Sequence, residues 1–162
     1  MSPDTIAWAM AIGGRHEHPH RMNANALDRE QQSFAAIPAS ARAARQFVVT
    51  TLRRHEAPPK VISDYALVVS ELVTNIIEHG DGGNVLIALD VADPDWWEME
   101  VVGGSATSPS TLLHPDSWTV ATADKASGRG LGIVRYLMDD IVTRTDAGQI
   151  SVLCRCRRAA PA

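Results

Sequence analysis

Apolar side chains recur every three or four residues in two stretches of the chain, at residues 39–54 and 63–80. This spacing places them along one side of a helix and predicts two amphipathic α-helices. Ser40 stands where it can cap the first helix, and Ser63 or Asp64 can cap the second. A Pro-Pro pair lies between the two stretches and separates the helices.

The pattern changes after the second helix. A strongly apolar run is typical of a buried strand, and the run after it alternates apolar with charged residues, as a half-buried strand does. Turn residues join the two runs, so we expect an antiparallel hairpin. A long loop rich in Gly, Ser, Thr and Ala, a short helix and a last hairpin follow. The expected segments are 85–91 and 97–102 for the first hairpin, 103–127 for the loop, 133–138 for the helix, and 141–144 with 149–156 for the last hairpin.

This order of elements predicts an α/β (α+β) two-layer sandwich, with a mixed, mainly antiparallel sheet covered on one face by helices. We expect one domain, at residues 33–158, followed by a short tail at 159–162. Residues 1–32 show no sustained periodicity and are expected to form a partly disordered N-terminal appendage.

Histidine and cysteine give little reason to expect a metal site. His16, His18 and His20 alternate within the appendage, but no second group of ligands accompanies them, so only adventitious metal binding is expected. Cys154 and Cys156 would point to the same face of the last strand. We expect them to be small buried or half-buried side chains.

Composition narrows the possible partners. The 162 residues include 15 Lys and Arg against 19 Asp and Glu, a formal net charge of -4, so the basic excess that favours nucleic-acid binding is missing. No apolar stretch approaches the roughly 20 residues of a membrane-spanning helix. The short apolar run at residues 6–12 has no basic residue before it, unlike a secretion signal. We therefore expect a cytoplasmic protein that binds neither nucleic acid nor membrane.

Two polar residues stand out in the second predicted helix. Glu71 and Asn75 are four residues apart, so both side chains project from one face, one turn apart. A carboxylate and an amide oxygen in this arrangement can position a reacting group and hold Mg²⁺. Taken alone, the same pair is more typical of a solvated helix face than of a site.

The third predicted helix begins at a glycine-rich segment, Gly128-Arg129-Gly130-Leu131-Gly132. Glycines permit close approach of the backbone, and the free N–H groups at a helix N-terminus favour an anion such as phosphate. The segment does not follow a strand, so the dinucleotide-binding fingerprint does not apply.

In this order the segments resemble the serine/threonine kinase-like anti-sigma factors, which belong to the ATPases that include sensor histidine kinases and type II topoisomerases (GHKL ATPases). Residues 67–80, LVVSELVTNIIEHG, resemble the family's N box, and residues 128–134, GRGLGIV, resemble its second glycine box. The resemblance covers about 125 residues, from the first predicted helix to the last hairpin.

The resemblance implies a Bergerat-type fold with ATP held between the N-box helix and a lid. It implies that Glu71 is the general base and that Asn75 binds Mg²⁺. The ATP-binding positions that it implies are Asn75, His79, Gly103, Ser105, Gly128, Arg129, Gly130, Leu131 and Gly132, with His79 at the edge of the pocket. It also implies a transcription regulator that sequesters a sigma factor, phosphorylates an anti-anti-sigma partner and forms a homodimer.

The chain departs from the family at the first glycine box. The family has an aspartate there that hydrogen-bonds the adenine amino group, and this chain has Gly103, although Ser105 and Pro109 match. Loss of such a hydrogen bond costs about 1–3 kcal/mol, or roughly tenfold to a hundredfold in affinity. Glycines at positions 103 and 104 could also bring the backbone closer to a ligand. The alternative function is therefore a protein-interaction module on the same scaffold that no longer depends on nucleotide.

Overall fold

A five-stranded sheet and three helices make up the computed structural model, which describes residues 29–104, 115–117 and 129–158. The strands are β1 (Arg29–Ala35), β2 (Asn84–Asp90), β3 (Trp96–Gly104), β4 (Asp140–Asp146) and β5 (Gln149–Arg157). Their order in the sheet is β1-β2-β3-β5-β4, and each neighbouring pair is antiparallel. The helices are α2 (Ser40–Arg54), α3 (Pro59–His79) and α4 (Arg129–Leu137), with a short 3-10 turn, η1 (Pro115–Ser117).

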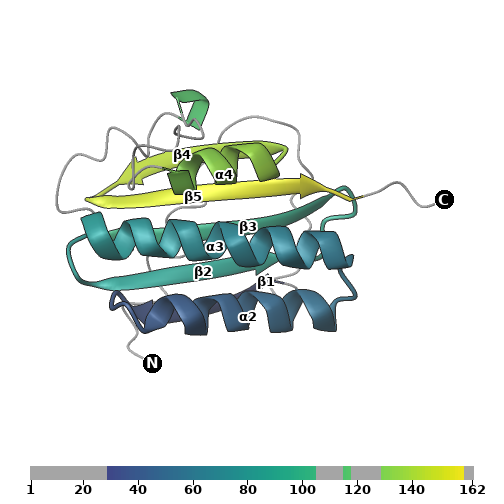
Figure 1. Ribbon diagram of the computed structural model, residues 1–162, viewed down its shortest axis with the longest axis horizontal. Helices are drawn as coiled ribbons and strands as arrows, with labels where there is room; N and C mark the ends of the chain where they lie inside the picture. The colour runs from purple at the N-terminus through teal and green to yellow at the C-terminus, as the bar shows by residue number, and fades with distance from the viewer. Residues whose placement is uncertain (1–28, 105–114, 118–128, 159–162) are drawn as a thin grey trace.

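All three helices lie on one face of the sheet, so the predicted two-layer α+β architecture is confirmed (Figure 1). The sheet is antiparallel throughout the described residues rather than mixed. The apolar sides of α2 and α3 pack against alternate residues of the central strands, because successive strand residues point to opposite faces. This core includes Val48, Leu52, Tyr65, Val69, Leu72, Ile87, Leu89, Met99, Val101, Val152 and Cys154.

Strand β1 was not predicted, and its first four residues fall in the segment expected to be a partly disordered appendage; it pairs antiparallel with β2 along its whole length. The strand contains one large apolar residue, Phe34, and is mostly exposed because it lies at the edge of the sheet. A polar edge strand has no alternating apolar pattern to detect. It is fixed to α2 through Glu30, whose carboxylate accepts a hydrogen bond from Arg54 at 2.7 Å and contacts His55 Nε2 at 2.7 Å.

Both long helices begin at positions other than the expected caps. Helix α3 begins at Pro59, one turn before Ser63, because proline is well suited to the first helical position. Ala39 is the N-cap residue of α2, and Ser40 is its first helical residue, with no side-chain cap. The lengths of both helices otherwise follow the predicted periodicity.

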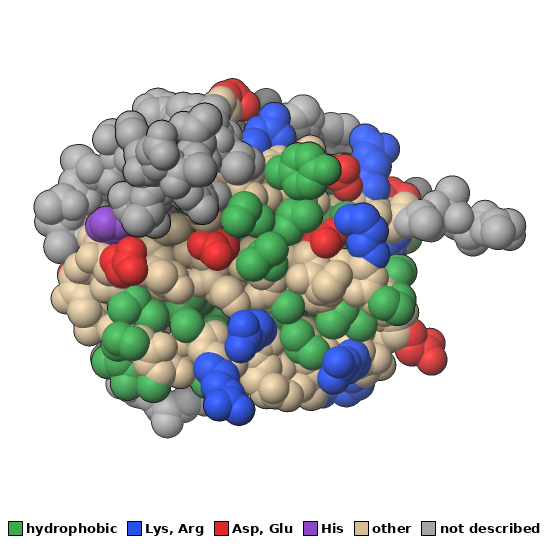
Figure 2. Space-filling model, viewed as in Figure 1, with side chains coloured by type: hydrophobic (Ala, Val, Ile, Leu, Met, Phe, Trp, Pro, Cys, Tyr) green, Lys and Arg blue, Asp and Glu red, His purple; other side chains and the backbone are tan. Residues whose placement is uncertain are grey.

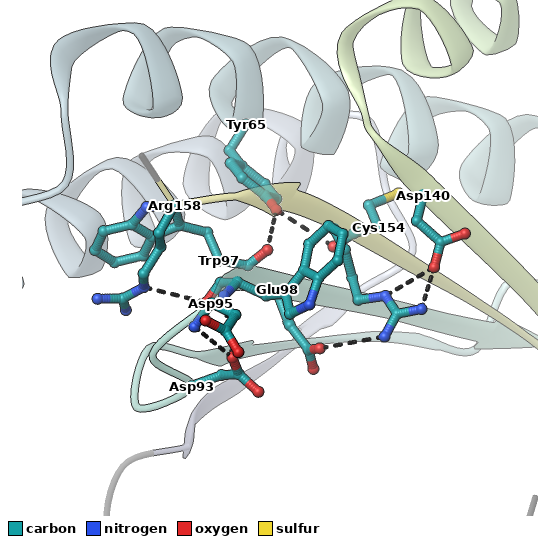
Figure 3. A network of polar contacts seen from close by, with 10 residues as sticks. Tyr65, Asp93, Asp95, Trp97, Glu98, Asp140, Cys154 and Arg158 are labelled. Atoms are coloured by element: carbon teal, nitrogen blue, oxygen red, sulfur yellow. Dashed lines mark hydrogen bonds and ion pairs between the residues drawn. The ribbon is translucent and has the colours of Figure 1, made fainter. Parts of the chain in front are cut away.

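A polar network joins α3 to the end of the sheet where β3 begins and β5 ends (Figure 3). The hydroxyl of Tyr65, a fully buried residue, donates to the carbonyl of Trp97 at 2.5 Å and contacts that of Cys154 at 3.3 Å. Arg158 lies over the Trp97 ring, 3.6 Å from its centroid, and donates to the Trp96 carbonyl. The end of β5 is therefore held by specific contacts.

Arg155 forms ion pairs with Asp140 and Glu98 on the two strands beside β5. The cysteines agree with expectation, since Cys154 is fully buried and Cys156 is half-buried. Burial raises the pKa of both thiols. Neither thiol is therefore an activated nucleophile.

Within the described residues, no helix is both long and apolar enough to cross a membrane. The same part of the chain contains no group of three or more potential metal ligands from His, Cys, Asp and Glu. The three histidines of the predicted appendage lie outside the described residues.

Candidate functional site

Helix α3 presents the two polar residues of the N-box segment on one face. Glu71 and Asn75 are both half-buried. The Asn75 side-chain nitrogen donates to the backbone carbonyl of Glu71 at 2.8 Å. This bond fixes the amide, and its oxygen accepts no hydrogen bond from the described residues. The oxygen is thus the end of the side chain that remains available for a ligand.

The first turn of α4 packs directly against Glu71. A Cβ added at Gly130 would lie 2.0 Å from Glu71 Oε2 and 2.9 Å from Glu71 Cδ. A side chain larger than hydrogen fits between the α4 backbone and this carboxylate only if the carboxylate moves. The glycine-rich segment and the N-box helix, far apart in the sequence, therefore meet at Glu71.

A carboxylate at the N-terminal turn of a helix is electrostatically favoured, because the free N–H groups there carry partial positive charge. The same N–H groups favour the binding of phosphate. Glu71 therefore lies where an anionic ligand at the start of α4 would be within reach of a general base. This arrangement is suited to phosphoryl transfer, in which positioning and charge stabilisation supply most of the catalysis.

The other residues of the glycine-rich segment have different surroundings. Leu131 is only 6% exposed and packs in the core with Val134, so it can contact a ligand only through its backbone. Gly132 is also buried, one residue further into α4. Arg129 is the first residue of the helix. Gly128 and Ser105 lie outside the described residues.

His79 lies at the C-terminal end of α3 and is exposed. Its ring nitrogen is 4.0 Å from the carboxylate of Glu78, and both side chains remain more than 60% exposed. Among the described residues, this is the one polar contact of the imidazole. The position agrees with the edge of a site rather than with a role in chemistry.

The end of β3 lies against α3 at Gly103. A Cβ added there would be 2.4 Å from Ile76 Cγ2, and Ile76 is only 4% exposed. At Gly104 the added Cβ would overlap the carboxylate of Asp81. Side chains of this chain thus fill the space beside both glycines, which the sequence left open for a ligand. The periodicity identified Ile76 only as a core position and gave no sign of this contact.

Charge is unevenly distributed over the helical face. Lys and Arg side chains gather over α2, while Asp and Glu side chains lie over α3 (Figure 2). Helix α2 carries four arginines and no acidic residue. Of the acidic residues on α3, Asp64 pairs with Lys60 and Glu78 lies in the exposed last turn, so Glu71 is the one that adjoins Asn75 and the start of α4.

The residues present fit a Mg²⁺-dependent nucleotide. Glu71 and Asn75 supply the hard oxygen atoms that Mg²⁺ prefers. Gly130 leaves the space beside Glu71 that any other residue would occupy. The individual roles of the predicted site residues remain predictions.

Comparison with known proteins agrees with this geometry. Residues 34–155 match a family described as the histidine kinase-like ATPase domain. No match was found among curated proteins.

Two solved structures are similar in fold. One contains the RsbU and RsbW domains of Rv1364c from Mycobacterium tuberculosis, with a TM-score of 0.58 and 17% identity, and covers 80% of this chain. The match spans 31% of the length of that larger protein. The other is the SiaB–SiaC complex from Pseudomonas aeruginosa, with a TM-score of 0.56 and 13% identity over 80% of this chain and 89% of the matched chain. The family match spans most of the sequence and includes both halves of the site, so this chain belongs to the histidine kinase-like ATPase domain family.

Proposed function

We propose that this chain is a cytoplasmic anti-sigma-factor kinase that binds ATP and Mg²⁺ in a domain at residues 29–158, which begins four residues before the predicted boundary because β1 belongs to the sheet. It sequesters a sigma factor and phosphorylates a serine or threonine of an anti-anti-sigma partner. The observation that carries the proposal is the contact between Glu71 and the Gly130 backbone, because it joins a general base to a phosphate-binding helix terminus.

Each residue has a defined task in this proposal. Asn75 is oriented by its hydrogen bond to the Glu71 carbonyl and would hold Mg²⁺ through its amide oxygen. A bound Mg²⁺ would neutralise charge on the phosphates of ATP. Residues 128–132 would contact the phosphates through the free N–H groups of the first turn of α4, and the Glu71 carboxylate would accept the proton of the attacking hydroxyl.

The proposal of a protein substrate is supported by two observations. The N box and the second glycine box resemble those of the anti-sigma-factor kinases. One of the structures with a similar fold is itself a complex, SiaB–SiaC. The resemblance to the kinases also implies a homodimer, which sedimentation would test.

Calorimetric titration of Mg²⁺·ATP into the wild type, Asn75→Ala and Asn84→Ala tests the proposal. Asn84 is the exposed first residue of β2 and serves as a control for the same chemical change. We expect micromolar binding by the wild type and Asn84→Ala, and binding at least about a hundredfold weaker by Asn75→Ala. This loss corresponds to about 2.7 kcal/mol, as for a metal ligand and charge-assisted contacts removed together.

Equal binding by wild type and Asn75→Ala would contradict the assigned site. A wild-type chain that binds no nucleotide, yet forms its partner complex equally well without one, would favour the nucleotide-independent interaction module instead. Phosphate transfer to the partner, lost in Glu71→Gln, would separate a kinase from a nucleotide-binding regulator.

A further inference from the structure

Strand β1 forms one edge of the sheet, and no other described strand pairs with its outer side. It pairs with β2 residue for residue from Arg29 to Ala35, without a bulge. In an antiparallel sheet, alternate N–H and C=O groups of an edge strand point away from its neighbour. The outer side of β1 therefore presents backbone donors and acceptors to which another extended segment can hydrogen-bond.

Little along this edge would prevent such pairing. Proteins usually protect exposed edges with charged side chains, proline or a bulge. Residues 31–35 contain neither a charge nor a proline, and the two charged residues of the strand, Arg29 and Glu30, are both held in ion pairs. The opposite edge strand, β4, carries three charged residues instead. Of the two edges, β1 is the better suited to receive a strand.

A groove lies between this edge and α2, which covers the β1 side of the sheet (Figure 1). Its volume is about 340 Å³. Its apolar part is formed by Phe34 and Phe47, with ring centroids 6.2 Å apart, and by Ala43, which is exposed. A strand added beside β1 would direct every second side chain to the helical face of the sheet, where the groove lies. The groove thus suits apolar side chains at alternate positions of that strand.

The charge of α2 indicates the charge of the partner. This helix carries four arginines and no acidic residue, although the whole chain has a formal net charge of -4. Arg54 lines the groove, and Arg53 is exposed next to it and has no ion pair within the described residues. Carboxylates of a partner would be attracted to this part of the surface, where basic side chains gather (Figure 2).

A second copy of this chain is a poor occupant of the same edge. Antiparallel pairing of two β1 strands would bring two α2 helices together on one face of the joined sheet, each with four arginines and no acidic residue. Juxtaposed like charges oppose association. An acidic segment of another protein has no such penalty.

We propose that the outer edge of β1 and the groove beside α2 bind an extended acidic segment of a protein partner. The segment adds to the sheet as a further strand, with its backbone hydrogen-bonded to β1 and its groove-facing apolar side chains against Phe34 and Phe47. Carboxylates at the end near Arg54 face the arginines of α2. Glu71 and Asn75 do not line the groove, so this binding needs no nucleotide and does not rest on the proposed function.

The experiment measures the binding of synthetic peptides to the full chain, without nucleotide, by fluorescence anisotropy. The probe is a blocked, labelled peptide of about eight residues, with valine and glutamate on one side of the extended chain and threonine on the other. One control peptide has lysine in place of glutamate. A second carries N-methyl groups on alternate amides, which removes backbone donors and leaves the side chains unchanged.

Two pairs of variants place the peptide on the surface. Ala43→Glu puts a carboxylate in the groove, and Ser63→Glu puts one on the exposed side of α3, outside it. Both positions are exposed in helices, where glutamate is a good helix former, so the fold is retained. Arg53→Gln removes a charge beside the groove, and Arg144→Gln removes one from the opposite edge strand.

We expect the wild type to bind the glutamate peptide at least about tenfold more tightly than either control peptide. Ala43→Glu should weaken this binding at least about tenfold, and Ser63→Glu should leave it within about twofold of the wild type. At low salt Arg53→Gln should weaken it about threefold, the size of one exposed ion pair, and Arg144→Gln should not change it.

Several results would overturn the inference. Tight binding of the N-methylated peptide would show that no strand is added, and equal effects of Ala43→Glu and Ser63→Glu would place the peptide elsewhere. A wild-type dimer that Ala43→Glu dissociates in sedimentation would make a second copy the occupant. A single-stranded oligonucleotide that binds more tightly than the glutamate peptide, and is released in Arg53→Gln, would assign the arginines to phosphate instead. Failure of the wild type to bind the glutamate peptide would also refute the site.

Discussion

Substitution of Gly130 by alanine should remove the function of Glu71 without unfolding the protein. The new methyl group would lie 2.0 Å from Glu71 Oε2, and ordinary van der Waals contact begins at 3.4 Å. The carboxylate must therefore move by about 1.4 Å. Glu71 is only half-buried, so its side chain can rotate away instead of forcing the helices apart.

The expected effect on catalysis is large and the effect on stability is small. A misplacement of about 1 Å costs roughly a hundredfold in rate, or about 2.7 kcal/mol in the activation free energy. Alanine is a better helix former than glycine by up to about 1 kcal/mol, so the free energy of unfolding should not fall. We expect ADP formation from Mg²⁺·ATP to slow about a hundredfold, with an unfolding midpoint equal to or above that of the wild type.

A double-mutant cycle with Gly130→Ala and Glu71→Ala tests whether the loss of rate arises from the displaced carboxylate. Glu71→Ala removes the atoms that the new methyl group would contact, apart from a Cβ at 3.3 Å. Gly130→Ala should then cost almost nothing further in the Glu71→Ala background, because residues that act as one unit are not additive. Independent, additive losses in the two single variants, or an unchanged rate in Gly130→Ala, would show that the carboxylate is not held as described.

Two further predictions concern the polar network where β3 begins and β5 ends (Figure 3). Tyr65→Phe should lower the free energy of unfolding by about 1–2 kcal/mol in urea titration, because two buried carbonyls lose a donor; Tyr136→Phe, at an 84% exposed position, is the control and should have no effect. Burial raises the pKa of Glu98 above its ordinary value, and Arg155 lowers it by less. The folded state then binds more protons, so this residue's contribution to stability is present below about pH 4.5 and is lost as the pH rises through the folded pKa. Glu98→Gln should therefore gain stability relative to the wild type between pH 4 and pH 7, and a relative loss over that range would contradict the assignment.

Local patterns predicted most of the secondary structure. The helical periodicity of residues 39–54 corresponds to α2, and the apolar run before Asp90 corresponds to β2. Both patterns arise because a buried face needs an apolar residue at each turn or at every second position. Strand β1 escaped detection because an exposed edge buries only Phe34 and Glu30 in part.

The candidate site was predicted less completely. The spacing of Glu71 and Asn75 predicted that they share one face of the helix, because helix geometry alone determines this. The glycine-rich segment was recognised by its composition, but its contact with Glu71 depends on how α4 packs on α3. The contacts of Arg155 and Arg158 with side chains and carbonyls of other strands likewise have no signal in the local sequence.

The sequence by itself therefore determined the helices, the central strands and the residue types available for chemistry, because each of these depends on neighbours within a few positions. The tertiary structure decided which of these residues meet. Gly103 is the clearest case. The sequence shows only that it stands where the family pattern has an aspartate, whereas the fold shows that Ile76 fills the space that a larger side chain would need. Such contacts join residues distant in the chain and depend on the fit of two packed surfaces, which no local pattern encodes.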